Sequence, residues 1–144
     1  MRSLRGLSWD SLSPKSDYTI SNFDIDLDFG RIGEQKVLDI FEGDGTIEVK
    51  TERDKWKKTG NIAIELSYKG RPSGLTTTDA KTWIHLLSYD GIIEGGFILD
   101  VLVFRNRVSK LVSEKIARVV YGGDGNFSEL ALIPIKHIFE IPGK

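Results

Sequence analysis

The sequence predicts an α/β protein in which helices flank a small mixed β-sheet. Two kinds of segment follow one another along the chain. In one kind apolar residues recur with the helical period of 3.6 residues, and in the other, shorter kind apolar and polar residues alternate. A nearly continuous apolar segment at 97–104 indicates a strand that is covered on both faces. Helical and extended segments in this order are typical of a sheet packed between helices.

One domain is expected to hold residues 1–144, because this length is near the commonest domain size and can bury a core without cross-links. Hydrophobic residues make up 40% and charged residues 28%, as in an ordinary soluble globule. The absence of cysteine excludes disulfides and thiolate metal sites. No apolar run approaches the ~20 residues that span a bilayer, and residues 1–13 lack a signal peptide's apolar stretch. We therefore expect a cytoplasmic protein without membrane contact.

The N-terminal part is predicted to lead into a first helix. Residues 1–20 are rich in serine and charge and are expected to be irregular. The alternation at 23–27 predicts an edge strand. Residues 30–41 follow the helical period, and Gly43 can end that helix. The apolar face of this predicted helix consists of Val37, Leu38 and Phe41.

Two strands and a charged loop are predicted next. Residues 46–51 and 61–68 alternate in polarity, and residues 52–60 between them form a charged loop. Residues 69–74 contain glycine and proline and are predicted to form a turn or an exposed loop. The alternation places one set of side chains of the second strand on one face: Ile62, Ile64, Leu66 and Tyr68. It places the other set on the opposite face: Asn61, Ala63, Glu65 and Ser67.

The C-terminal half is predicted to alternate helices with strands. Thr77 or Thr78 can cap a helix. The apolar stripe of this helix consists of Ala80, Trp83, Ile84 and Leu87. The apolar strand at 97–104 is followed by a long amphipathic helix at 106–120. A last strand at 130–135 is limited to a sheet edge, because Pro134 lacks a backbone N–H.

Glu48 and Lys50 are the residues whose placement suggests chemistry. They stand two apart on the predicted strand 46–51, so both side chains point to one face, while Ile47 and Val49 are expected to face the core. A carboxylate beside an ammonium suits phosphodiester hydrolysis. The carboxylate can hold Mg²⁺ or Mn²⁺, and the lysine can orient a water and neutralise developing charge. The Glu-x-Lys triplet alone is also common on solvated edge strands.

Further acids would complete such a metal site. Glu34 lies on the apolar face of the predicted first helix, and Glu65 lies on the next strand. Asp39 and Asp44 are alternatives for the second ligand. If residues 37–41 form a strand, Asp39 sits opposite the carboxylate of the Glu-x-Lys triplet. If they form a helix, as their period indicates, Asp39 faces away and Asp44 is the nearer acid.

Basic residues after the triplet are candidates for contacts to the phosphates of a nucleic acid, although the net charge of −1 favours no partner. These candidates are Arg53, Lys55, Lys57, Lys58, Lys69 and Arg71. Trp56 can stack on a base or cover the edge of the core. Trp83 is expected in the core. His85 and His137 are expected to be structural, because their spacing fits no metal site.

The combined run of residues resembles the PD-(D/E)XK nuclease superfamily, in particular a small branch found in phage and bacterial endonuclease-like proteins. The resemblance covers about residues 30–87. It rests on Gly33-Glu34 on a helix, Ile47-Glu48-Val49-Lys50 on a strand, Thr59-Gly60-Asn61-Ile62-Ala63-Ile64-Glu65 on the next strand, and the downstream Gly70-Arg71-Pro72-Ser73-Gly74-Leu75, Thr78 and Trp83.

The resemblance implies a restriction-endonuclease-like core, with a central mixed β-sheet flanked by helices, and a Mg²⁺- or Mn²⁺-dependent DNA endonuclease. It implies catalytic roles for Glu34, Glu48, Lys50 and an aspartate, and a metal held by Glu34, that aspartate, Glu48 and the Val49 carbonyl. The aspartate is Asp39 or Asp44, of which Asp44 is favoured. A phage-encoded member would act in the host-cell cytoplasm, and a homodimer would let two centres cut both strands. The superfamily aspartate usually precedes Glu-x-Lys by a longer spacing. The alternative is therefore an inactive nucleic-acid-binding or partner-binding module on the same fold.

Overall fold

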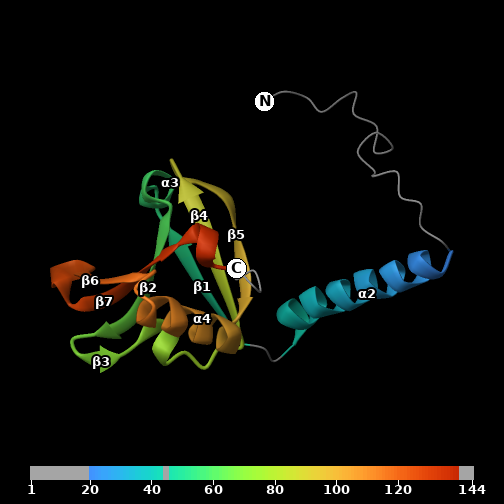
Figure 1. Cartoon of the computed structure of the whole chain (residues 1–144), viewed down its shortest axis with the longest axis horizontal. Helices are drawn as coiled ribbons and strands as arrows, with labels where there is room; N and C mark the ends of the chain where they lie inside the picture. Colours follow the sequence, from blue (N-terminus) through green and yellow to red (C-terminus); the bar gives the residue numbers. More distant parts are fainter. Residues whose placement is uncertain (1–19, 44–45, 140–144) are drawn as a thin grey trace. The chain divides into compact units, whose positions relative to one another are not determined.

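The computed structural model describes residues 20–43 and 46–139 (Figure 1). The chain divides into two compact units, Met1–Asp39 and Ile40–Lys144. The segment predicted to be irregular, 1–20, lies outside the described residues except for Ile20, where the first described helix begins. No helix in the described part of the chain is both long and apolar enough to cross a membrane.

The described residues of the first unit belong to helix α2, Ile20–Glu42, whose last three residues are counted in the second unit. The helix predicted from residue 30 is confirmed, and it ends directly before Gly43. The edge strand predicted at 23–27 is wrong, because its backbone is helical.

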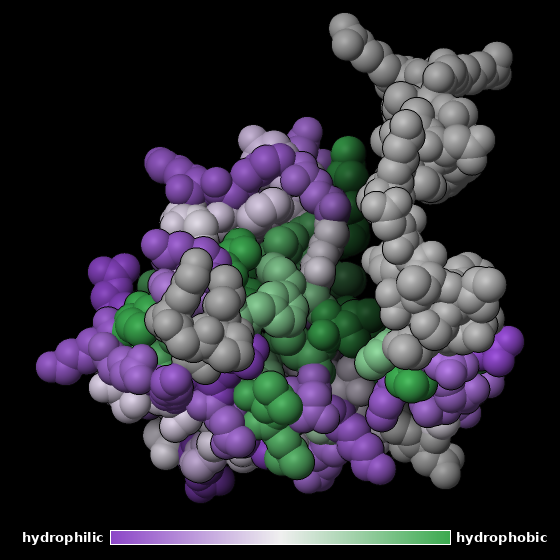
Figure 2. Space-filling view, turned by 45° about the vertical axis from the view of Figure 1, so that its right-hand side comes forward, coloured by the Kyte–Doolittle hydropathy of each residue, from purple (hydrophilic) through white to green (hydrophobic). Residues whose placement is uncertain are grey.

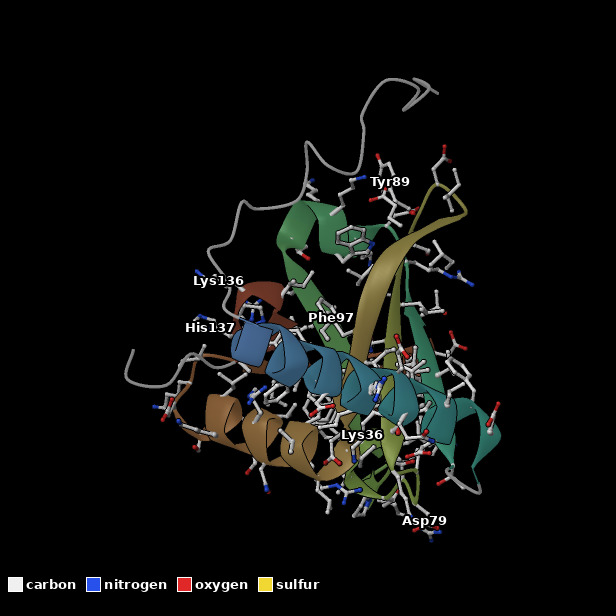
Figure 3. All side chains as sticks on the ribbon, turned by 90° about the vertical axis from the view of Figure 1, so that its right-hand side faces the viewer. Lys36, Asp79, Tyr89, Phe97, Lys136 and His137 are labelled. Atoms are coloured by element: carbon white, nitrogen blue, oxygen red, sulfur yellow. The ribbon has the colours of Figure 1, made fainter. Side chains whose placement is uncertain are left out.

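The second unit contains two β-sheets and one long helix, which confirms the mixed α/β class (Figure 1). The first sheet has the order β1-β4-β5. Its strands are β1 Ile47–Glu52, β4 Thr82–Tyr89 and β5 Ile92–Asp100. β1 is parallel to β4, whereas β4 and β5 are antiparallel, so this sheet is mixed. Figure 3 shows Asp79, just before β4, and Tyr89, its last residue, at opposite ends of the sheet.

The second sheet is antiparallel and has the order β3-β2-β7-β6. Its strands are β2 Asn61–Tyr68, β3 Arg71–Pro72, β6 Arg118–Gly122 and β7 Ser128–Pro134. The connections contain helices α3 Lys55–Thr59 and α4 Val101–Ser113 and the 3-10 turns η1 Gly74–Thr76, η2 Asp124–Asn126 and η3 Ile135–His137. The loop predicted at 52–60 therefore includes a short helix.

The helix predicted after Thr77 or Thr78 is wrong, because this segment forms β4. Alternate residues of β4 are buried, and they include Trp83, His85 and Leu87. The segment is also rich in β-branched and aromatic residues, which favour strands. Asp90 and Gly91, with φ of 49° and 75°, form the two-residue turn to β5.

The following elements are displaced from their predicted positions. Only the first part of 97–104 is strand, because α4 begins at Val101. The side chain of Asp100 caps this helix by accepting a hydrogen bond from the Val103 amide at 2.9 Å. The helix predicted to reach residue 120 ends at Ser113, and β6 follows.

The last strand, β7, is an interior strand of its sheet and not the predicted edge strand. It pairs with β2 on one side and β6 on the other. Pro134 is the final residue of β7, opposite Asn61. Its missing N–H therefore removes no hydrogen bond from the middle of the ladder.

The core lies between the two sheets and α4. Trp83 and Phe104, which are 1% and 0% exposed, pack with ring centres 5.9 Å apart, so the expectation that Trp83 belongs to the core is confirmed. Beside this core, Phe97 lies close to η3, and its ring centre is 5.9 Å from that of Phe139 (Figure 3).

The outer face of the first sheet is less covered. Val49, Ile84 and Ile98 lie in one row across its three strands, and Val49 and Ile98 are about half exposed. On the face of the molecule seen in Figure 2, apolar side chains gather in one area that charged and polar side chains border.

Replacing Phe104 tests the placement of the core. Phe104→Ala is expected to lower the free energy of unfolding by about 3–5 kcal/mol, because it removes a fully buried ring and leaves a cavity. Urea denaturation measures the change. Leu102→Ala on the same helix is the control, since Leu102 is 66% exposed. Equal losses in the two variants would contradict the described orientation of α4.

Candidate functional site

Glu48 and Lys50 form an ion pair on β1. The Glu48 Oε1 and Lys50 Nζ atoms are 2.5 Å apart, and both side chains are partly exposed. The two residues are same-face neighbours because side chains alternate along a strand. The sequence therefore predicted correctly that these two groups lie together.

The face of β1 that carries this pair is the inward one. Glu48 lies opposite Trp83 and Lys50 lies opposite His85 in the parallel register, so they share a face with two buried residues of β4. Val49 points the other way and is 51% exposed. The expectation that Val49 faces the core was wrong, because β1 is an outer strand of its sheet whose inward side borders a polar cleft.

This cleft has a volume of about 320 Å³ and lies between the two sheets. β1 and β4 form one wall, and β2 and β7 form the other. Its lining residues are Lys50, Thr51, Glu52, Ala63, Glu65, Trp83, His85 and Leu130. The Lys50 ammonium lies 6.0 Å from the centre of the Trp83 ring, so the ring and Glu48 together hold the lysine at the cleft.

Glu52 and His85 form a second polar pair in the cleft. The indole Nε1–H of Trp83 donates to His85 Nδ1 at 3.2 Å. Because an indole nitrogen only donates, His85 Nδ1 carries no proton, and Nε2–H donates to Glu52 Oε2 at 3.0 Å. The same Glu52 oxygen accepts the backbone N–H of Ala63 at 3.1 Å, which ties β1 to β2.

Sequence reasoning missed Glu52, although a signal was present. The alternation of Glu48 and Lys50 continues for one more step, so Glu52 falls on the same face of β1. His85 is structural in the sense that each ring nitrogen has a partner. It also lines the cleft, which the spacing of the two histidines could not indicate.

Glu65 lies in the cleft wall opposite β1. Its Oε1 accepts the Ser128 hydroxyl at 2.7 Å, and its Oε2 accepts the Ser73 hydroxyl at 3.1 Å. β2 belongs to the second sheet, so Glu65 is not a strand neighbour of Glu48, and it lines the cleft together with Lys50. Its two serine partners fix the carboxylate in place.

The remaining predicted acids lie elsewhere. Asp44 lies outside the described residues. Residues 37–41 are helical, and Asp39 on α2 is exposed, where its Oδ1 accepts the side-chain amide of Gln35 at 2.8 Å. Glu34 is also an exposed residue of α2. Both acids belong to the first unit, so no distance relates them to Glu48.

The predicted basic residues form two groups, one at each end of β2. The first group lies in or next to α3, just before β2, and the second group lies in the turn after it: Arg53, Lys55, Lys57 and Lys58 in the first, Lys69 and Arg71 in the second. The eight residues of β2 separate them by roughly 25 Å. All six are exposed.

Lys57 of the first group and its neighbour Trp56 have partners on the β4–β5 hairpin. Lys57 pairs with Glu94 at 2.5 Å and lies 4.1 Å from the ring centre of Tyr89. The Trp56 indole donates to the Ser88 carbonyl at 2.6 Å and its ring packs against the core, so Trp56 covers the core edge.

The described residues contain no group of three or more histidine and acidic side chains suited to a divalent metal. Glu48 supplies one carboxylate, with the Val49 carbonyl beside it in sequence. Mg²⁺ usually keeps several waters and binds through one or two carboxylates, so the chemistry of these oxygen donors fits a hard cation.

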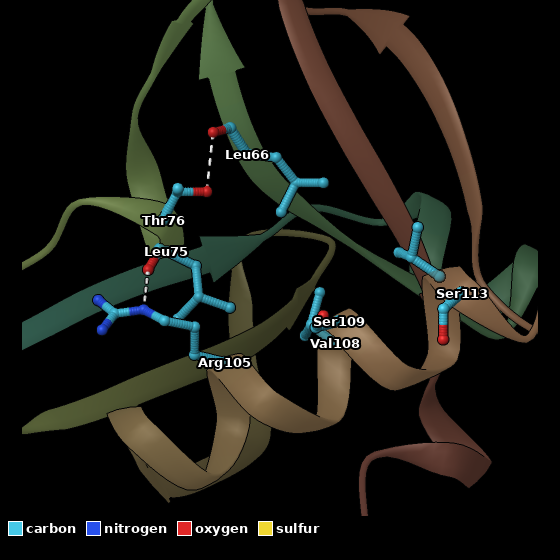
Figure 4. Close-up of a pocket in the computed structure, with 8 residues that line it drawn as sticks. Leu66, Leu75, Thr76, Arg105, Val108, Ser109 and Ser113 are labelled. Carbon is cyan, nitrogen blue, oxygen red and sulfur yellow. Dashed lines mark hydrogen bonds between the residues drawn. The ribbon is translucent and has the colours of Figure 1, made fainter.

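A second pocket lies on the other side of β2, between η1 and α4 (Figure 4). It has a volume of about 470 Å³ and is lined mainly by apolar groups such as Leu66, Leu75 and Val108. Arg105 is the charged residue in its lining, and this guanidinium donates to the carbonyls of Leu75 and Thr78. By contrast, the first cleft is lined by the ionisable side chains of Lys50, Glu52, Glu65 and His85.

Glu52 tests the connection between the sheets. Glu52→Ala is expected to lower the free energy of unfolding by about 1–3 kcal/mol, because it leaves the donors of His85 and Ala63 without an acceptor. Glu52→Gln keeps one acceptor oxygen and should restore much of the loss. Glu94→Ala, which removes an exposed acid, is the control. A loss in Glu52→Ala no larger than in the control would argue against the described contacts.

Comparison with known proteins identifies no family for this chain. No protein-family model, curated protein or solved structure matches the chain.

Proposed function

We propose that this protein is a Mg²⁺- or Mn²⁺-dependent DNA endonuclease with a restriction-endonuclease-like core of the PD-(D/E)XK type. The observation that carries the proposal is the contact of 2.5 Å between Glu48 and Lys50 at the edge of a polar cleft. A carboxylate and an ammonium on one rigid strand supply the two charges that phosphodiester hydrolysis needs, one for the cation and one for the phosphate.

In this proposal Glu48 and the Val49 carbonyl would hold the cation, together with bound water. When bound, the cation supplies an acidified water and neutralises charge on the phosphate. With the Glu48 carboxylate on the cation, the three N–H donors of Lys50 would be available to a water or a phosphate oxygen. The Trp83 ring keeps that ammonium at the cleft.

In this proposal Glu52 and His85 are positioning residues that hold β1 in place. Glu52 is the last residue of the strand that carries the ion pair, and its bonds to His85 and Ala63 hold the strand end against both sheets. Placement of reacting groups on a braced strand limits their motion, which favours reaction with a bound phosphodiester.

The exposed cations after β1 support DNA as the substrate. Arg53, Lys55 and Lys58 follow the strand directly and project from a short helix and the loop before it. Contacts of this kind bind the phosphate backbone without reading sequence.

The second candidate function is a nucleic-acid-binding or partner-binding module without activity. The observation in its favour is that the described residues hold no cluster of three acids or histidines, while Glu48 is engaged by Lys50. A titration with Mn²⁺ separates the candidates: the nuclease binds the ion in a manner that Glu48→Gln weakens, whereas the binding module does not.

Lys50→Ala and Glu48→Gln are expected to lower the cleavage rate by at least about 100-fold, because each removes a charge that acts on the transition state. Cleavage of labelled duplex, nicked, flap and single-stranded DNA in Mg²⁺, in Mn²⁺ and in chelator measures the effect. Binding of DNA in chelator should persist in both variants. The exposed residue Glu94, as Glu94→Gln, is the control. Undiminished cleavage by either cleft variant would refute the assignment.

The double variant Lys55→Gln and Lys58→Gln is expected to weaken DNA binding and to flatten its dependence on salt. Each lost phosphate contact should reduce the slope of log K against log salt by about 0.9 for duplex DNA. Fluorescence anisotropy over a salt series measures the slope. Lys57→Gln is the matched control on the same helix, because Glu94 already neutralises that ammonium. Identical slopes in all three proteins would exclude α3 from the DNA interface.

A further inference from the structure

Two exposed aromatic residues lie beside the cleft, at the far end of β2. Tyr68 is the last residue of β2 and is 43% exposed, and Phe127 precedes β7 and is 50% exposed. Their ring centres are 6.3 Å apart, with the rings nearly perpendicular. Neither residue has a part in the proposed chemistry or was selected by the sequence pattern.

A β-bulge turns Tyr68 toward the cleft. Strict alternation would place Tyr68 on the face of Ile64 and Leu66, away from Glu65. The register between β2 and β7 shifts between Glu65 and Ser67, so Tyr68 lies opposite Ser128. Ser128 bonds to Glu65 in the cleft wall, which shows that Tyr68 is on the cleft face of the sheet. The predicted face of Tyr68 was therefore wrong.

A backbone hydrogen bond fixes the position of Phe127. The amide of Lys69 donates to the Phe127 carbonyl at 2.9 Å, which joins the turn after β2 to the segment before β7. Gly125 has a φ of 70°, and a Cβ atom there would approach the Phe127 ring to 2.5 Å. Glycine at this position thus leaves room for the ring.

Positive charge surrounds the two rings. Arg71 lies directly opposite Tyr68 in the β2–β3 pair and so shares its face. The Lys69 ammonium lies 5.5 Å from the ring centre of Tyr68 and 5.0 Å from that of Phe127. Of the two acids nearest on β2 and β7, Glu65 accepts two serine hydroxyls, and Glu129 faces the opposite side with Ser67.

We propose that Tyr68 and Phe127 form a stacking platform for an unpaired base of the DNA strand that enters the cleft, with Lys69 and Arg71 on the adjoining phosphates. Exposed aromatic rings next to cations are the recognition chemistry of single-stranded nucleic acid. Stacking of a base on a ring contributes more binding free energy than the contact of an exposed lysine with that ring. A base would therefore displace Lys69 from the rings, and the ammonium would bind phosphate.

The platform is placed to serve the same strand as the cleft. Glu65 in the cleft wall precedes Tyr68 by three residues on β2, which corresponds to about 10 Å along a strand. A nucleic acid held at Lys50 can therefore extend along β2 to the two rings. The substrate class that follows is DNA with an unpaired segment, such as a flap or an overhang, in preference to continuous duplex. This inference rests on the proposed function in its assumption that DNA occupies the cleft.

The test measures binding of the full chain to a short single-stranded oligonucleotide and to an abasic oligomer of the same length, in chelator. Tyr68→Leu and Phe127→Leu should each weaken binding of the normal oligonucleotide by about tenfold. They should leave binding of the abasic oligomer unchanged, because it offers only a backbone. Tyr121→Leu is the matched control, since Tyr121 is 72% exposed but pairs with Glu129 and so faces the other side of the sheet.

Tyr68→Phe keeps the ring and should bind like the wild type, and thermal melting verifies that each variant is folded. Equal losses for normal and abasic oligomers would overturn the stacking role, as would losses no larger than that of Tyr121→Leu. Failure of the wild type to bind any oligonucleotide would also overturn it and favour a protein partner for the patch. Because no metal is present, a base-dependent loss can be seen in a protein that never cuts DNA. Conversely, if Tyr68→Leu cleaves DNA with an unpaired segment as fast as the wild type, the stacking platform is refuted, whereas the proposed nuclease function is not.

Discussion

The cleft depends on the bonds made by one carboxylate, that of Glu52. A single oxygen of this side chain accepts a ring N–H from His85 on β4 and a backbone N–H from Ala63 on β2, so it joins residues of two different sheets. The acceptor is strong because it is charged, and the His85 donor is oriented by Trp83 on its other nitrogen. The separation of the cleft walls near Lys50 follows from this junction.

The polar cleft and the apolar core are built on the same strands. Trp83 illustrates this arrangement: its ring packs on Phe104 in the core, its edge donates to His85, and Lys50 lies over its face. A change in the packing of Trp83 would therefore be transmitted to the lysine and the histidine together. Coupling of this kind makes the position of the site a property of the whole second unit.

The sequence predicted what short-range alternation determines. The sequence predicted the strand that carries Glu48 and Lys50, with these two polar groups on one face. It also predicted the strand 61–68 and the mixed α/β class. β4 was mistaken for a helix because its large apolar residues also match a helical spacing, although Asp90-Gly91 was a local hairpin signal. Which face of β1 is buried depends on its register with β4, and the orientation of Tyr68 depends on a bulge. Neither is encoded in the spacing of neighbouring residues.

The position of β1 in its sheet has a consequence for solubility. Within the described residues, β1 pairs only with β4, so its other side presents backbone groups that no strand satisfies. An open edge with apolar neighbours such as Val49 can template pairing with another chain, and natural proteins oppose this with charged side chains, especially lysine. Glu48 and Lys50 would then guard the folded chain against self-association as well as act on a substrate. Polar replacements at these two positions preserve that protection better than apolar ones.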